Sequence, residues 1–207
     1  MISAQDALKG LREGNARFLS GSSHQGSPAN HPHQFKSIDR QEPSAIILGC
    51  SDSRVPPEVV FDQGIGDLFV IRVAGNIVTP TQTGSIEFAV EKFGSRLVVV
   101  LGHTMCEAIR ATLDALEIPA QSRPENLYSI IDSISPCLEP LLKASPKASE
   151  DTLLREAMRQ NIRHSVQQLR QQSSILQKQI DENGLEIIGA EYCVSTGAVD
   201  FFDPDAN

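Results

Sequence analysis

Four short apolar runs, separated by longer amphipathic stretches, constrain the fold of this chain more than any other feature. The runs lie at residues 45–49, 68–73, 97–102 and 185–190, and each has the length of one strand. Strands that are apolar on both faces are typical of a parallel sheet with helices on either side. We therefore expect an α/β fold with a mainly parallel β-sheet flanked by α-helices.

The stretches between the runs place their apolar residues at helical spacing. Within residues 83–94, for example, the apolar side chains fall on one helical face and Gly94 ends the pattern. Ser3 is well placed to cap a first helix. Helices are expected over residues 3–18, 83–94, 106–116 and 152–182. Residues 19–43, rich in Ser, Gly, Pro and His, are expected to form a loop.

Composition limits the class of protein. The 207 residues, 40% hydrophobic and 21% charged, fit one globular domain. We expect a single domain over residues 1–207, with an N-terminal helix and loop arm (1–43) and an α/β core (44–207). The formal net charge of −8, with no basic patch, argues against a nucleic-acid partner.

Other features indicate the compartment. No apolar stretch is long enough to span a bilayer, so we expect no membrane partner. The N-terminus lacks the basic start and apolar block of a signal peptide, which predicts a cytoplasmic protein. In that setting the four cysteines are expected to be thiols or metal ligands rather than disulfides.

Chemically active side chains follow two of the four runs. Cys50, Asp52 and Arg54 occupy alternate positions directly after the first run, and His103 and Cys106 follow the third. Ligands of open α/β sheets bind beyond the carboxyl ends of the strands, so two thiols and an imidazole should meet in one crevice there. Cys and His are ligands that Zn²⁺ prefers, and one turn can fold His-x-x-Cys around a metal.

These residues also have a plainer interpretation. A lone cysteine after a strand is usually a small buried hydrophobe, and a lone histidine is usually just hydrogen-bonded. The two placements at strand ends, with Asp52 and Arg54 beside the first, favour a functional crevice over coincidence. Cys137 and Cys193 have no comparable neighbours, and we expect both to be structural.

Most of the chain resembles the β-class carbonic anhydrases. The matching segments are GCSDSRVPPEVVFDQGIGDLFVIRVAGN, GSIEFAV, VVVLGHTMC and IIGAEYCVSTGAV, and the specific part is Cys-x-Asp-x-Arg paired with His-x-x-Cys. The resemblance implies Zn²⁺ held by Cys50, His103 and Cys106. It implies homodimers or homotetramers, with the N-terminal arm packing on a dimer partner. It also implies that zinc-bound hydroxide reversibly hydrates CO₂ to bicarbonate and a proton.

Asp52 and Arg54 have a clear role in such a site. Three protein ligands leave a fourth position for water, and zinc lowers the pKa of that water to about 7. We expect Asp52 to accept a hydrogen bond from the water and Arg54 to hold the carboxylate by a two-point bond. Two alternatives stay open: a local ion pair that stabilises a turn, and Asp52 as a fourth metal ligand that closes the site.

The resemblance also implies substrate contacts. Gln41 lies nine residues before Cys50, where the plant-like branch of the family carries a glutamine thought to bind substrate, and it favours the open site. Phe69, Ala74 and Phe88 match an apolar substrate pocket, which suits uncharged CO₂. The alternatives are core packing for these three and an ordinary polar loop residue for Gln41.

Glu107 departs from the family pattern, which usually has glycine after the second zinc cysteine. It could pair with Arg110 in the first turn of a helix, or it could alter access and substrate. Relatives that hydrolyse carbonyl sulfide or carbon disulfide use the same ligands on the same fold. A carbonyl sulfide or carbon disulfide hydrolase and an inactive zinc-binding scaffold therefore remain alternatives to a carbonic anhydrase.

Overall fold

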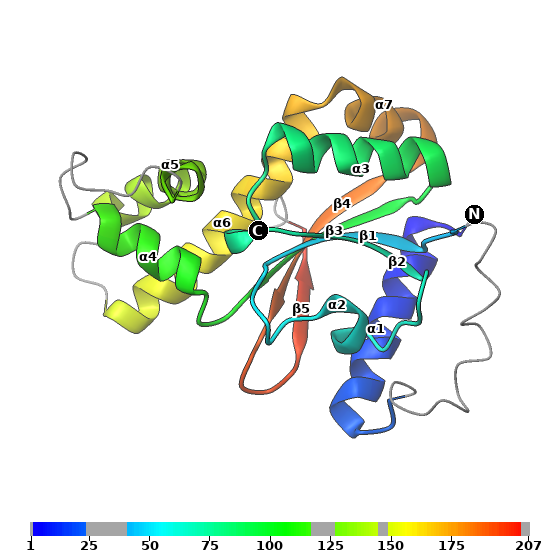
Figure 1. The fold of residues 1–207 in the computed structure, drawn as a ribbon, viewed down its shortest axis with the longest axis horizontal. Coiled ribbons are helices and arrows are strands. Elements are labelled where there is room, and N and C mark those ends of the chain that lie inside the picture. The colour runs from blue at the N-terminus through cyan, green and yellow to red at the C-terminus, as the bar shows by residue number, and fades with distance from the viewer. Residues whose placement is uncertain (1, 24–40, 117–126, 145–148, 204–207) are drawn as a thin grey trace.

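A computed structural model describes residues 2–23, 41–116, 127–144 and 149–203. Within them five strands form one sheet in the order β2-β1-β3-β4-β5 (Figure 1). The first four run parallel, and β5 pairs antiparallel with β4. The prediction of a mainly parallel sheet is confirmed. The strands are β1 (Ala45–Gly49), β2 (Leu68–Arg72), β3 (Leu97–His103), β4 (Glu186–Tyr192) and β5 (Val199–Phe202).

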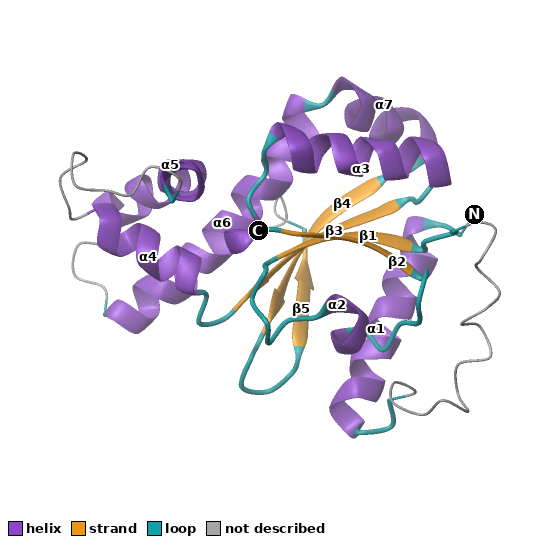
Figure 2. Ribbon diagram, in the orientation of Figure 1, coloured by secondary structure: helices purple, strands orange, loops and turns teal. Residues whose placement is uncertain are grey.

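Helices cover both faces of this sheet (Figure 2). One face carries α1 and α2, and the other carries α3, α6 and α7, while α4 and α5 pack on α6 to one side (Figure 1). The helical elements are α1 (Ala4–Ser20), α2 (Pro57–Val60), the 3₁₀ turn η2 (Ala74–Asn76), α3 (Pro80–Phe93), α4 (Glu107–Leu116), α5 (Tyr128–Ala144), α6 (Glu150–Gln172) and α7 (Ser174–Asn183).

The two faces of the sheet have separate apolar cores because successive strand residues point to opposite sides. In β1, Ile47 packs toward Leu11 of α1, whereas Ile46 packs toward Ile86 of α3 and Ile162 of α6. All five side chains are almost fully buried. Each such aliphatic side chain contributes roughly 1.5–3 kcal/mol through burial, which anchors the central strands and therefore the position of their carboxyl ends.

The helix predictions were right in kind and wrong in detail. The helical stretch expected over residues 152–182 is two helices, because the hydroxyl of Ser173 accepts the amide of Leu176 and caps a new helix. Helix α5 was not predicted; it contains Pro136 and Pro140, which usually interrupt helices. The short strand β5 was also missed, and the sequence 199–202 has too few residues to show a strand period.

The N-terminal arm is described only in part. Helix α1 begins after Ser3, whose hydroxyl accepts the amide of Asp6, and it ends at Gly21 in the left-handed conformation. Its buried face lies on the sheet of its own chain. Residues 24–40, which belong to the predicted loop, lie outside the described residues, so packing of the arm on a partner stays a prediction. None of the helices in the described ranges has the length and apolar character needed to cross a membrane.

Candidate metal centre

The carboxyl ends of β1 and β3 lie side by side because these strands pair in parallel. Cys50 directly follows β1, His103 is the last residue of β3, and Cys106 immediately precedes α4. One potential ligand atom from each residue lies within 4.8 Å of the other two, and all three residues are buried. The structure therefore brings together the two thiols and the imidazole that follow the first and third apolar runs.

The hydrogen bonding of His103 fits a metal ligand. Its Nδ1 lies 3.0 Å from the carbonyl oxygen of Thr104, and a carbonyl can only accept, so Nδ1 carries the proton. Nε2 then presents its lone pair; this atom is buried and has no hydrogen-bond partner among the described residues. Leaving a buried acceptor unpaired is costly. A zinc ion between this nitrogen and two sulfur atoms would satisfy it, and the donor set is one that zinc prefers.

The two thiols influence each other. The Cys106 thiol and the backbone amides of Asp52 and Gly75 donate toward Cys50, which holds the pKa of the Cys50 thiol well below its usual value. Contact with Cys50, together with burial, raises the pKa of Cys106. The site thus favours one thiolate before any metal binds, and the thiolate is the form that ligates metals.

A two-point ion pair holds Asp52. Nε of Arg54 donates to Oδ1 at 2.9 Å and Nη2 donates to Oδ2 at 2.7 Å, while the backbone N–H of Arg54 donates to Oδ1 at 2.9 Å. These bonds from Arg54 lower the pKa of Asp52 to about 2. Nη2 also donates to the carbonyl of Met105 at 3.1 Å, which joins the loop after β1 to the loop after β3.

Asp52 lies beside the group of three ligands without belonging to it. Its Oδ2 is 3.9 Å from Nε2 of His103, which is beyond hydrogen-bond distance. Both carboxylate oxygens face Arg54 instead. The structure therefore pairs Asp52 with Arg54 and leaves it outside the group of three ligand atoms.

Arg72, which is not part of either ligand motif, supports the loop that carries Cys50. Its Nε donates to the carbonyl of Cys50 at 3.0 Å and its Nη2 donates to the carbonyl of Asp52 at 2.6 Å. Arg72 reaches them because it ends β2 directly opposite Gly49, the last residue of β1. Parallel pairing of the first two apolar runs is the sequence signal that places it there.

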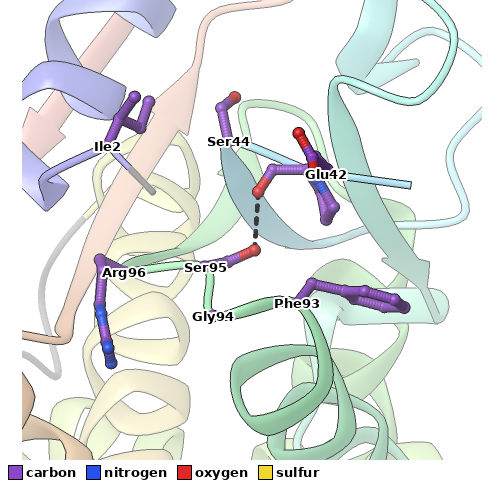
Figure 3. Close-up of a pocket in the computed structure, with 8 residues that line it drawn as sticks. Ile2, Glu42, Ser44, Phe93, Gly94, Ser95 and Arg96 are labelled. Atoms are coloured by element: carbon purple, nitrogen blue, oxygen red, sulfur yellow. Dashed lines mark hydrogen bonds between the residues drawn. The ribbon is translucent and has the colours of Figure 1, made fainter. Parts of the chain in front are cut away.

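Gln41 lies at the other end of the sheet. It is exposed and precedes β1, whose carboxyl end carries the metal group. At this amino end the hydroxyl of Ser95 donates to the carbonyl of Pro43 at 2.7 Å, within a pocket formed by the segments that precede β1 and β3 (Figure 3). A five-residue strand spans roughly 17 Å, so Gln41 is remote from the metal group of its own chain.

The three residues matched to a substrate pocket fall in two places. Ala74 lies beside the metal group, since the amide of the next residue, Gly75, donates to the Cys50 sulfur. Phe69 of β2 and Phe88 of α3 instead pack on Phe93, with ring centroids 5.9 and 5.6 Å apart. Phe88 is 53% exposed and lies on α3, which packs against the edge strand β2. Within one chain only Ala74 is next to the ligands.

Glu107 opens α4 and is exposed, so its side chain points away from the buried ligands. Glu107 nonetheless affects the site through its charge. Asp52 is the main cause that raises the pKa of the Arg54 guanidinium, and the negative charge of Glu107 raises it further.

Cys137 and Cys193 are outside the ligand group. Cys137 donates to the carbonyl of Ile134 within α5.

The chain matches the carbonic anhydrase family over residues 45–199. It is 35% identical over 204 residues to a carbonic anhydrase of Mycolicibacterium smegmatis, covering 94% of this chain and 91% of the relative. It is also 35% identical over 203 residues to carbonic anhydrase 2 of Mycobacterium tuberculosis, covering 92% and 89%. The solved β-carbonic anhydrase CafA of Aspergillus fumigatus superposes with a TM-score of 0.77 at 26% identity, covering 86% and 85%. The chain belongs to the β-carbonic anhydrase family.

Proposed function

We propose that this protein is a zinc-dependent carbonic anhydrase that catalyses the reversible hydration of CO₂ to bicarbonate and a proton. The observation that carries the proposal is the buried group of Cys50, His103 and Cys106, in which Nε2 of His103 has no other partner among the described residues. Membership of the family supports the reaction, because the relatives named above are carbonic anhydrases.

Zinc is the metal that best fits these donors. Two thiolates and an imidazole suit a borderline-soft ion, whereas magnesium and calcium prefer oxygen ligands. Bound by three protein ligands, zinc would supply a Lewis acid with one open position, which brings the pKa of water toward about 7. The two thiolates cancel the charge of Zn²⁺, so the surrounding residues must also help to activate the water.

Asp52 and Arg54 are the residues that we propose for this task. An ionised carboxylate only accepts hydrogen bonds, so Asp52 would accept a hydrogen bond from the reacting water and orient it with an oxygen lone pair directed at CO₂. Arg54 keeps the carboxylate in place by its two-point bond. Since the pKa of Asp52 is about 2, the carboxylate remains an acceptor throughout the neutral range.

Two other functions use the same ligands, and neither is favoured here. An inactive scaffold would not need the Asp52–Arg54 pair, which is intact. A carbonyl sulfide or carbon disulfide hydrolase would be favoured by a Glu107 side chain that reshapes the entrance from within, but this residue is exposed.

Metal analysis and CO₂ hydration by the purified protein test the proposal, with carbonyl sulfide hydrolysis run in parallel. We expect about one zinc per chain and a faster turnover of CO₂ than of carbonyl sulfide. The Glu107→Gly variant should keep the same substrate preference and change its rates no more than about twofold, the size of an exposed helix pair of roughly 0.2–0.5 kcal/mol. Zinc without hydration would indicate a scaffold, and preference for carbonyl sulfide would indicate a hydrolase; either result overturns the proposal.

We further propose that two copies pair through β2. This strand ends the sheet, and no second neighbour pairs with it among the described residues. Unpaired strand edges readily pair with another chain, and the exposed ring of Phe88 adds apolar surface beside this edge. A two-fold axis relates identical edges in antiparallel fashion, which would place the amino end of one sheet beside the carboxyl end of the other. Gln41 and Phe69 would then approach the metal group of the partner subunit.

The mass in solution tests this dimer. The wild-type protein should have at least twice the chain mass of 22.5 kDa, and Phe88→Asp should lower the mass and the activity together. Leu127→Asp is the matched control, because it places the same charge on another exposed side chain, just before α5, and should leave the mass unchanged. An active wild-type monomer would contradict the proposal.

A cytoplasmic location stays a prediction from the sequence. It agrees with the four cysteines, none of which forms a disulfide, because cysteines without disulfides are typical of reducing compartments.

A further inference from the structure

We propose that Asn161 is a positioning residue of the metal centre: by holding the carbonyl of Gly75, it directs the Gly75 amide at the sulfur of Cys50. The inference rests on the proposed function, since it takes Cys50 as a metal ligand. It concerns a side chain on α6, outside both ligand motifs.

The Gly75 amide is a direct partner of the ligand. Its nitrogen lies 3.3 Å from the Cys50 sulfur, and the bond is buried. An N–H donated to a thiolate stabilises the negative charge on sulfur. Groups that hydrogen-bond to metal ligands orient them and tune metal affinity, so the direction of this one amide matters for the centre.

The turn that carries this amide needs support from elsewhere. Gly75 and Asn76 have φ angles of 71° and 44°, so two successive residues are left-handed. That region is unfavourable for Asn compared with Gly, and such backbones persist only where the surroundings fix them. A side chain at position 75 would also clash, since a Cβ there would lie 2.8 Å from Cδ1 of Ile134.

Helix α6 supplies the support through two buried polar side chains. Nδ2 of Asn161 donates to the carbonyl of Gly75 at 2.7 Å, and the hydroxyl of Ser165 donates to the carbonyl of Asn76 at 3.1 Å. Both residues are 1% exposed and lie on the same face of the helix, four residues apart. Asn161 therefore holds the peptide next to the one that contacts Cys50.

Packing fixes α6 where Asn161 can reach the turn. Ile162, the next residue, sits against β3 and β4 at two glycines: a Cβ at Gly102 would meet it at 2.5 Å and one at Gly189 would meet it at 2.9 Å. Helix α6 can approach the sheet this closely only because both of these strand positions are glycine, so it cannot shift without losing this contact. The end of β3, the turn η2 and α6 thus form one rigid support behind the ligands.

The side chain of Asn161 is a poor choice for stability alone. Its Oδ1 is buried without a hydrogen-bond partner among the described residues, as is Nδ2 of Asn76. Burying an unpaired polar atom is unfavourable, and an apolar side chain of similar size at position 161 would have no such atom. An amide at this position is better explained by what its Nδ2 does for Gly75.

The test uses Asn161→Leu and two readouts that do not depend on activity. Zinc release to a competing chelator should show an affinity about 10- to 100-fold lower, the usual effect of losing a partner of a ligand. In the cobalt-substituted protein, the thiolate-to-metal charge-transfer band should move to longer wavelength, because sulfur that loses a hydrogen bond gives up an electron more easily. Ser165→Ala should change both readouts in the same direction by a smaller factor, and it serves as the second variant if Asn161→Leu does not fold.

Asn15→Leu is the matched control. Asn15 is a buried asparagine, 5% exposed, whose Nδ2 also donates to backbone carbonyls, those of Val60 and Gly197, but in the core beneath α1. It should destabilise the fold without changing zinc release or the cobalt band. Wild-type readouts in Asn161→Leu, or equal changes in Asn15→Leu, would overturn the inference. A wild-type protein that binds neither metal would instead overturn the proposed function.

Discussion

Asp52→Asn is expected to lower CO₂ hydration about 100-fold, the usual effect of removing one preorganised polar group from an active site, while zinc stays bound. The amide is nearly the same size as the carboxylate, so the ligands should not move. It can, however, donate to the reacting water as well as accept from it, and it cannot form two charged bonds with Arg54. Turnover by stopped flow and zinc content by elemental analysis check both parts.

Asp132→Asn is the control for this change, since it alters an exposed aspartate on α5 in the same way and should leave the rate unchanged.

Arg54→Ala should be about as damaging as Asp52→Asn, for a different reason. Without the two-point bond, Asp52 keeps only the backbone N–H of position 54 as a partner, so its carboxylate can turn toward His103, 3.9 Å away, and occupy the open metal position. Normal turnover in both variants would show that the pair only stabilises a turn.

The parallel core of the fold is predictable from sequence because its signal is local. Each central strand is a continuous apolar run, and β1 and β3 are buried at every residue, as a strand covered on both faces must be. The misses are places where tertiary contacts override local pattern. The break at Ser173 depends on a cap and on a bond from its hydroxyl to Glu87 of α3, and neither is visible as a period in the sequence.

The candidate site divides in the same way. Cys50 and His103 could be placed together because topology alone sets the neighbours of two parallel strand ends. The same reasoning places Arg72 opposite Gly49, but it does not show that Arg72 bonds the carbonyl of Cys50. Asn161 could not be found in this way, because it comes from a helix more than 100 residues after Cys50. On a polar helix, no sequence pattern distinguishes an asparagine whose side chain is buried from one whose side chain is exposed.

Cys106→Ser is expected to remove zinc and most of the hydration activity. A serine hydroxyl stays protonated near neutral pH and is a poor zinc ligand, whereas thiolate sulfur is a strong one. Cys193→Ser is the matched control: it makes the same atomic change at a thiol outside the ligand group and should keep both zinc and activity. Full zinc occupancy in Cys106→Ser would remove Cys106 from the ligand set.

Thermal unfolding separates loss of the metal from loss of the fold in this variant. An ion that binds only the folded chain raises its stability by RT ln(1 + [L]/Kd), so zinc should raise the melting temperature of the wild-type protein and not that of Cys106→Ser. Stripped of zinc by a chelator, the two proteins should melt at similar temperatures, because serine replaces a buried cysteine with little change in volume. If Cys106→Ser melts well below the stripped wild type, its inactivity reflects damaged packing around α4. The thiolate-to-metal charge-transfer band of the cobalt-substituted Cys106→Ser protein is then the test of Cys106 as a ligand.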